Sequence, residues 1–119
     1  MSYFRSCYFI SILNKLYSQH SNAINELCLI SNEGKIIEFF SDNEVEKDRI
    51  ATSIMATIAL STRAMKNLSK EKIKLITLKG DSSSIITVFT RNNRYLYINI
   101  KTKNLKKVLK DFEAIMEQV

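Results

Sequence analysis

The chain contains no proline and only two glycines, Gly34 and Gly80, among its 119 residues. Each glycine lies where a turn is expected, whereas a phosphate-binding P-loop or a dinucleotide-binding fingerprint needs several glycines at fixed spacing. Without proline, sequence repeats or a Gly/Ser-rich linker, the chain offers no place for a domain boundary. We therefore expect residues 1–119 to form one domain that does not itself hydrolyse a nucleotide.

Residues with catalytic or metal-binding chemistry are also scarce. The one histidine, His20, has no Cys, Asp or Glu at metal-ligand spacing, so we expect it to face solvent at a helix end. The two cysteines, Cys7 and Cys28, lie in apolar stretches without motif spacing, which is typical of buried reduced thiols. We predict a protein that is not an enzyme, with no catalytic residue, metal site, cofactor or disulfide framework.

No apolar run approaches the roughly twenty residues that a bilayer-spanning helix requires. The first residues, MSYFRSCYFISIL, combine one arginine with an apolar run but lack a small-residue cleavage site. We interpret them as a first helix and not as a signal peptide. A membrane-surface role for this helix has little support because only Arg5 and Lys15 supply basic charge. A cytoplasmic location is expected.

Acidic residues are the minority, since 18 Lys and Arg against 12 Asp and Glu give a formal net charge of +6. Much of the excess gathers in one region, in Arg63, Lys66, Lys70, Lys72, Lys74 and Lys79, with Glu71 as the one acidic residue among them. An acidic cluster at residues 42–48 comes before it. The dipole of the helix predicted between the two regions favours acidic residues at its start and basic residues at its end. The Arg and Tyr residues at 91–97 fit a turn and a strand better than a base-stacking surface. Nucleic-acid binding is not predicted.

Hydrophobic periodicity predicts eight elements in the order helix, strand, strand, helix, strand, strand, strand, helix. Ser41 followed by Glu44 matches a capping box and is predicted to open the central helix. The predicted ranges are 3–19 for the first helix, 24–31 and 35–40 for a hairpin that turns at Gly34, 41–68 for the central helix, 72–78, 85–90 and 95–100 for the later strands, and a final helix after Asn104. This order predicts an α+β fold, a five-stranded antiparallel sheet with helices on both faces.

The central helix is the most informative segment because residues 50–62, IATSIMATIALST, include no charged residue. One stripe at helical spacing is predicted to pack on the domain itself, formed by Ile50, Ile54, Ile58, Met65 and Leu68. A second face carries small or soft side chains where a solvated helix would place Lys and Glu, namely Thr52, Met55, Ala56, Ala59 and Thr62. This face favours contact with a second copy of the chain in a two-fold dimer. The alternative is a helix buried inside a single domain.

The order and texture of these segments resemble the Roadblock family over nearly the whole chain. The segments that carry the resemblance are an N-terminal helix, the hairpin LISNEGKIIEFF and the helix IATSIMATIALSTRAMKNL. The matching residues are Leu27, Leu29, Ile30, Gly34, Ile36, Ile37, Ala51, Ala56, Ala59 and Leu60. A longin domain begins directly with strands, so the first helix favours Roadblock.

The resemblance implies a small non-catalytic adaptor that binds, regulates or scaffolds a Ras-like small GTPase. It would act as a homodimer or pair with a paralogous Roadblock chain, with the central helices antiparallel and the third strands joined edge to edge. The implied interface residues are Thr52, Met55, Ala56, Ala59 and Thr62 on the helix, and Ile73, Leu75 and Thr77 on the strand. Lysines at 72, 74 and 79 argue against edge pairing, because lysine on an edge strand also prevents it.

Other functions remain open at this point. The same resemblance also implies a dynein light-chain-type motor adaptor, and a PAS/GAF-like or longin-like binding module is a further alternative. A ligand sensor would need a polar-lined cavity, whereas the predicted interior consists of Ile and Leu. A candidate partner surface comprises Tyr3, Phe4 and Tyr8 on the first helix, with Arg63 and Lys66 on the central helix.

Overall fold

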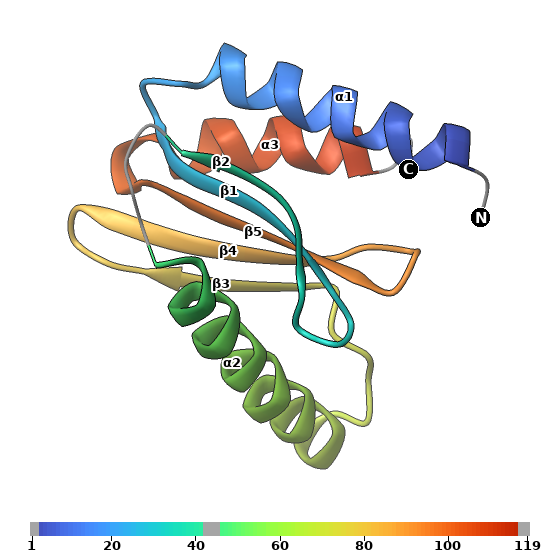
Figure 1. Cartoon of the computed structure of the whole chain (residues 1–119). Helices are drawn as coiled ribbons and strands as arrows, with labels where there is room; N and C mark the ends of the chain where they lie inside the picture. Colours follow the sequence, from blue (N-terminus) through green and yellow to red (C-terminus); the bar gives the residue numbers. More distant parts are fainter. Residues whose placement is uncertain (1–2, 42–45, 117–119) are drawn as a thin grey trace.

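The computed structural model describes the backbone of residues 3–41 and 46–116, with side chains at residues 10–41 and 46–114. The elements follow the predicted order (Figure 1). They are α1 (Tyr3–Gln19), β1 (Ile24–Ser31), β2 (Ile36–Ser41), α2 (Lys47–Leu68), β3 (Leu75–Lys79), β4 (Ser83–Phe89), β5 (Arg94–Lys101), a short 3-10 helix η1 (Thr102–Asn104) and α3 (Leu105–Met116). Among the described residues, no helix is both long and apolar enough to cross a membrane.

The five strands form one antiparallel sheet in the order β2-β1-β5-β4-β3. Helices α1 and α3 cover one face of this sheet, and α2 lies against the other (Figure 1). The N-terminal hairpin and the C-terminal meander of three strands meet where β1 pairs with β5 at the centre. The predicted α+β class with helices on both faces is therefore confirmed.

The β1–β2 hairpin turns where the sequence predicted. Gly34 has a φ of +85°, a left-handed conformation that glycine adopts at little cost. Its backbone N–H donates to the carbonyl of Ser31 at 3.0 Å, and the Ser31 N–H donates to the carbonyl of Lys35 at 2.8 Å. These bonds close the turn and fix the register of the two strands.

The start of α2 differs from the prediction. Ser41 is the last residue of β2, where it pairs with Glu26, and its hydroxyl donates to the carbonyl of Asn25 at 3.3 Å. The helix begins at Lys47 after Glu46, which makes no side-chain capping bond. The capping-box prediction is therefore wrong at Ser41, because strand pairing holds this residue in an extended conformation. Its predicted partner Glu44 lies outside the described residues.

Two later strands also have different bounds. Strand β3 begins at Leu75, three residues after its predicted start, and β4 begins at Ser83 inside a run predicted as a polar loop. Backbone pairing with β5 continues to Ser83, and the hydroxyl of Ser84 lies 2.8 Å from that of Thr102. Strand β4 can extend through these polar residues because the hydrogen bond gives the buried Ser84 hydroxyl a partner.

The larger hydrophobic core lies between the sheet and helices α1 and α3. Its fully buried side chains come from both helices and from three strands, and include Leu13, Leu16, Leu27, Leu29, Ile86, Leu96, Ile98, Val108 and Phe112. Beside it, His20 Nε2 lies 2.8 Å from Asp111 Oδ2, joining the end of α1 to α3. The His20 side chain is only 12% exposed, so the predicted solvent-facing position is wrong.

The core on the α2 face is smaller. Its buried members are Cys28, Ile30, Ile54, Ile58 and Tyr97. The predicted core stripe of α2 is therefore confirmed at Ile54 and Ile58, with Ile50 and Met65 half-buried. It fails at Leu68, which is exposed because the last turns of α2 extend beyond the sheet (Figure 1).

Candidate protein-interaction surface

Four large hydrophobic side chains are exposed on the described part of the chain, and all of them belong to α2 or β3. Leu60 is 71% and Leu68 85% exposed on the helix, and Leu75 is 37% and Leu78 48% exposed on the strand. Scattered exposed leucines are common, but a group confined to two neighbouring elements is typical of a protein-protein contact.

Leu68 of the helix and Leu75 of the strand both line a hollow of about 370 Å³ beside the sheet edge. It is lined by Ala64, Met65 and Leu68 from α2 and by Leu75 and Ile76 from β3, among other residues. Leu60, Ala64 and Leu68 recur every four residues, so they lie along one side of the helix. We call the set Leu60, Ala64, Leu68 and Leu78 the leucine surface. Leu75 adjoins it on the edge strand, but its side chain lies on the α3 face of the sheet, opposite Val88.

Strand β3 is an edge strand. It pairs with β4 from Leu75 to Lys79 and ends the sheet, so no strand among the described residues pairs with its outer side. An apolar edge with unpaired backbone groups is a site where another chain can add a strand. Together with the leucine surface, it makes α2 and β3 the most accessible apolar region of the described chain.

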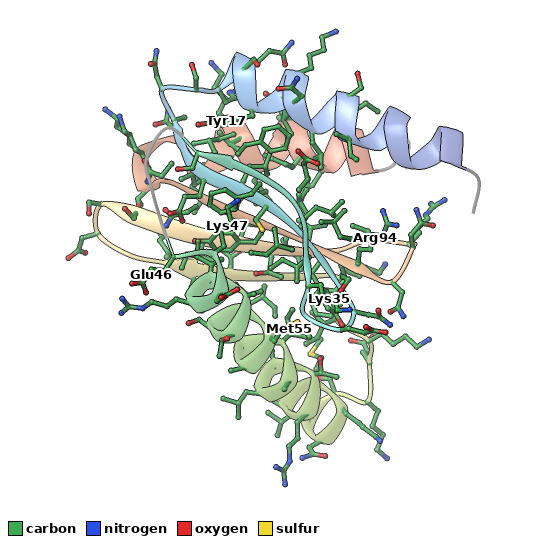
Figure 2. All side chains as sticks on the ribbon, in the orientation of Figure 1. Tyr17, Lys35, Glu46, Lys47, Met55 and Arg94 are labelled. Carbon is green, nitrogen blue, oxygen red and sulfur yellow. The ribbon has the colours of Figure 1, made fainter. Side chains whose placement is uncertain are left out.

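The predicted interface is divided between two places in the structure. Ile73 and Leu75 line the hollow beside β3, and Thr77 is exposed on the same strand. Thr52 and Met55 instead line a separate hollow with Gly34 at the β1–β2 turn. Figure 2 shows Met55 close to this turn, near Lys35. A Cβ atom placed on Gly34 would lie 3.2 Å from Met55 Cγ, so Met55 is partly covered by its own domain.

The remaining helix residues of the prediction are Ala56, Ala59 and Thr62, which are all exposed. At about 100° per residue, Ala59 and Ala64 project about 140° apart around the helix axis. The centre of the predicted face therefore differs from that of the leucine surface, although Ala56 lies next to Leu60 where the two meet. The sequence reasoning missed Ala64 and assigned Leu68 to the core, although the four-residue spacing from Leu60 to Leu68 was a signal for a separate stripe.

The predicted partner surface is only partly described. Tyr3, Phe4 and Tyr8 belong to α1, but their side chains lie outside the described residues. Arg63 and Lys66 are exposed on α2. Lys66 faces a second hollow, which it shares with other basic residues and which is described below.

Titratable groups inside the α2 core are held in their neutral forms. Burial, with a smaller effect of Glu26, raises the pKa of the Cys28 thiol from 9.0 to about 12. Burial also raises the pKa of Tyr97 well above its usual value, and its hydroxyl donates to Glu26 Oε1 at 2.8 Å. A thiol that stays protonated is a poor nucleophile. Within the described chain, no three His, Cys, Asp or Glu side chains gather to hold a metal ion.

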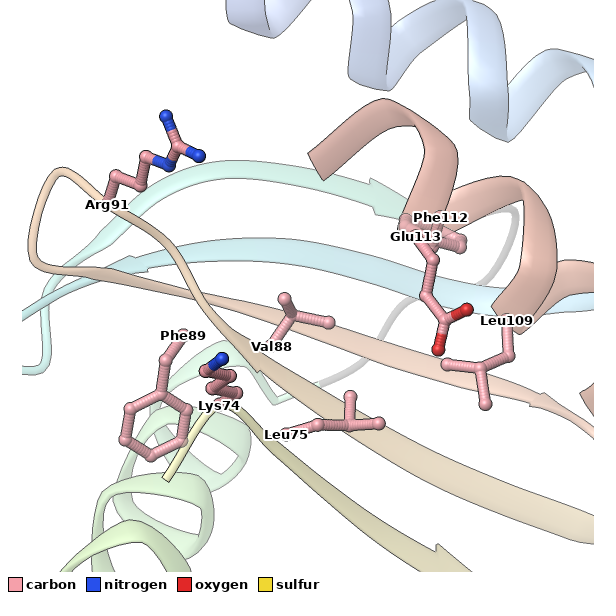
Figure 3. A pocket seen from close by; sticks show the side chains of 8 residues that line it. All are labelled: Lys74, Leu75, Val88, Phe89, Arg91, Leu109, Phe112 and Glu113. Atoms are coloured by element: carbon pink, nitrogen blue, oxygen red, sulfur yellow. The ribbon is translucent and has the colours of Figure 1, made fainter. Parts of the chain in front are cut away.

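A groove of about 500 Å³ lies on the other face, between α3 and the β3–β4 edge (Figure 3). Leu75, Val88, Leu109 and Phe112 provide its apolar lining. Lys74, Arg91 and Glu113 carry the charged groups around it (Figure 3). It has no cluster of polar groups of the kind that orients a small-molecule substrate.

The sequence matches no protein-family model and no curated protein sequence. Solved structures are nevertheless similar to this chain. MglB of Myxococcus xanthus is 14% identical with a TM-score of 0.66, and the match covers 88% of this chain and 91% of that chain. A Roadblock/LC7 domain from Streptomyces avermitilis is 11% identical with a TM-score of 0.71, covering 82% of both chains. The gliding protein MglB of Thermus thermophilus is 13% identical with a TM-score of 0.68, covering 92% of this chain and 89% of that one. The chain has the Roadblock fold that its sequence predicted.

Proposed function

We propose that this protein is a non-catalytic adaptor that dimerises through the leucine surface and binds or regulates a Ras-like small GTPase. The observation that carries the proposal is the group of exposed leucines on α2 and β3, at a sheet edge without a partner strand. The GTPase partner is inferred from the Roadblock fold. This fold favours such a function over the longin-like and PAS/GAF-like alternatives, and a dynein light-chain-type adaptor stays the second candidate.

A two-fold dimer suits this surface because the same patch serves both chains. Antiparallel α2 helices would cover Leu60, Ala64 and Leu68, and two β3 strands would satisfy each other's free backbone groups. A register centred on Thr77 places Lys79 opposite Leu75 across the symmetry axis. In this register no lysine faces another lysine, so the basic residues at the edge are compatible with pairing.

A structure of the same fold supports self-association. It is a structure of MglB with a tetrameric arrangement, a chain 13% identical to this one. From that structure we infer only that domains of this fold can associate with one another. The residues involved are inferred from the exposed leucines of this chain.

The dimer is tested by the mass from light scattering after gel filtration, over a broad dilution series. Ala64→Glu is compared with Ala59→Glu, which places the same charge on the opposite side of the same helix. We expect a wild-type mass of two chains, a single chain for Ala64→Glu and no change for Ala59→Glu. If Ala59→Glu dissociates the dimer and Ala64→Glu does not, the interface is on the helix face predicted from sequence. A wild-type monomer at every concentration would overturn the dimer.

The GTPase part needs a separate measurement. Ras-like GTPases loaded with GDP or with a non-hydrolysable GTP analogue are tested for binding, and hydrolysis and nucleotide exchange are then measured for those that bind. Binding that prefers one nucleotide state supports a regulator, and binding without preference supports a scaffold. If no member of a broad panel binds, the GTPase assignment is wrong whatever the oligomeric state.

A further inference from the structure

A second hollow, of about 410 Å³, lies where the end of α2, the α2–β3 connection and the β4–β5 turn come together. Three lysines line it, Lys66, Lys70 and Lys72, against the single carboxylate of Glu71. Arg94 borders it at the β4–β5 turn, but its side chain alternates with Tyr95 and lies on the other face of the sheet. We call this hollow the basic pocket. It gathers much of the basic excess of the sequence, which the proposed dimer and GTPase binding leave without a role.

The cations of the basic pocket are not neutralised by the protein itself. The ion pairs within 4 Å among the described residues are His20 with Asp111 and Lys35 with Glu33. Lys66, Lys70 and Lys72 are exposed, and Arg94 is half-buried on β5 (Figure 2). The three lysines outnumber the one carboxylate of Glu71, so a bound anionic group would be stabilised there.

The backbone holds the basic residues in this arrangement at a cost. Lys70 and Asn93 both line the pocket, and they are the non-glycine residues with positive φ in the described chain, at 55° and 62°. Asparagine tolerates this conformation, but lysine seldom adopts it. Glycine is the usual residue just beyond a helix end, where it adopts the left-handed conformation. The lysine at position 70 therefore brings a charge to a place where helix geometry alone favours glycine.

Below the charges, the pocket is lined by apolar groups. Phe89 and Tyr95 pack edge to face, with ring centroids 5.2 Å apart and planes at 73°, and Ile73 lies beside them. Both rings also pack on the α2 core, so they are half-buried. A nucleic acid base would need an open ring face for stacking, whereas a single apolar side chain needs only a small apolar hollow. The shape and charge therefore favour a peptide over a nucleic acid.

We propose that the basic pocket binds an acidic segment of a partner protein. An apolar side chain of this segment would contact Phe89, Tyr95 and Ile73, and flanking Asp or Glu carboxylates would meet the three lysines. Lys66 and Leu68 project from opposite sides of α2, so the pocket stays open in the proposed dimer. The proposal does not depend on the dimer or on a GTPase.

The test uses the full chain and a fluorescein-labelled peptide of sequence Asp-Glu-Glu-Leu-Glu-Glu-Asp, with fluorescence anisotropy at several salt concentrations. One control peptide replaces Asp and Glu by Asn and Gln, and a single-stranded oligonucleotide of equal charge tests the nucleic acid alternative. We expect the acidic peptide to bind with an affinity that falls as salt increases. Equal binding of the uncharged peptide, tighter binding of the oligonucleotide, or no peptide binding at millimolar concentration would overturn the proposal.

Two charge-matched variants locate the site. Lys66→Gln/Lys72→Gln removes two charges from the pocket, and Lys106→Gln/Lys107→Gln removes two exposed charges from α3. We expect the first to weaken peptide binding by about tenfold and the second by less than about twofold. Equal losses would mean that only net charge matters, which would overturn the site.

A third variant separates charge from folding. Lys70→Gly removes a pocket charge while relieving the left-handed backbone, so it should fold at least as stably as the wild type and still bind the peptide more weakly. Unchanged peptide binding would exclude Lys70 from the site and contradict the proposal. The monomeric Ala64→Glu variant should keep full peptide binding, which distinguishes failure of this proposal from failure of the dimer.

Discussion

The two faces of the sheet differ in how completely the chain covers them. Helices α1 and α3 close one face over a core with side chains at or near zero exposure, such as Leu13 and Phe112. On the other face, α2 covers a smaller core and then extends beyond the sheet with Leu60 and Leu68 exposed. The chain itself thus covers one face of the sheet completely. The surfaces that we assign to partner proteins lie on the α2 face.

The largest effect that tests this contrast is expected for Phe112→Ala on the closed face. Loss of a fully buried phenyl ring should lower the free energy of unfolding by about 3–5 kcal/mol, measured by urea denaturation. Leu60→Ala on the open face is the control, measured at a concentration where the protein is monomeric. It should change stability by less than about 0.5 kcal/mol. Similar losses in the two variants would contradict the contrast.

Gly34→Ala tests how the hairpin holds α2. The new side chain would be strained at a φ of +85° and would lie 3.2 Å from Met55 Cγ. We expect a loss of about 1–3 kcal/mol in the same denaturation experiment. Glu33→Ala in the same turn should have little effect. Adding Met55→Ala to Gly34→Ala should restore only the part of the lost stability that comes from the contact with Met55. Full recovery of stability would mean that backbone strain at position 34 is negligible.

A smaller effect is expected where α1 is joined to α3. His20→Ala removes the 2.8 Å interaction with Asp111 and should cost about 1 kcal/mol. A double-mutant cycle with Asp111→Ala, measured by thermal or urea unfolding, isolates the pairwise contribution. A coupling energy of zero would mean that apolar packing alone holds the two helices on the sheet.

The smallest effect on stability at neutral pH is expected from ionisation of the Cys28 thiol. This effect should appear only in alkaline solution. The unfolded thiol ionises near pH 9.0, whereas the folded thiol keeps its proton until about pH 12. Its contribution to stability is therefore complete below pH 9 and is lost as pH rises between these values. Cys28→Ala should flatten the fall in stability over this range, measured by urea unfolding at each pH.

Alkylation provides a second measurement of Cys28. A Cys7→Ser background leaves Cys28 as the only thiol. Because Cys28 is fully buried, iodoacetamide at pH 8 should modify it only after urea is added. Rapid modification of the native protein would show that the α2 face opens easily.

Sequence periodicity predicted the elements well where one pattern dominated. The bounds of α1 and β1 agree with the prediction, and for β1 the apolar run between polar turns leaves few alternatives. Local signals failed where distant pairing decided the outcome. Ser41 has the chemistry of a helix cap, but its pairing with Glu26 of β1 keeps it in a strand.

The interaction surfaces were harder to predict for a related reason. The sequence gives the stripes of α2 but not the side of the helix that lies beside β3, which depends on contacts such as Met55 with Gly34. In the same way, the lysines near residue 70 were visible as a charge excess. These lysines come close to Arg94 and to the rings of Phe89 and Tyr95 only once β4 and β5 have folded.

The central pairing of β1 with β5 also constrains how the chain is made. Partners such as Leu27 and Ile98 lie roughly 70 residues apart in the sequence. While the chain leaves the ribosome, β1 has only the short strand β2 beside it until β5 has been synthesised. Folding of the sheet should therefore be slow, because the apolar strand β1 remains without its central neighbour until β5 emerges and is available to chaperones in the meantime.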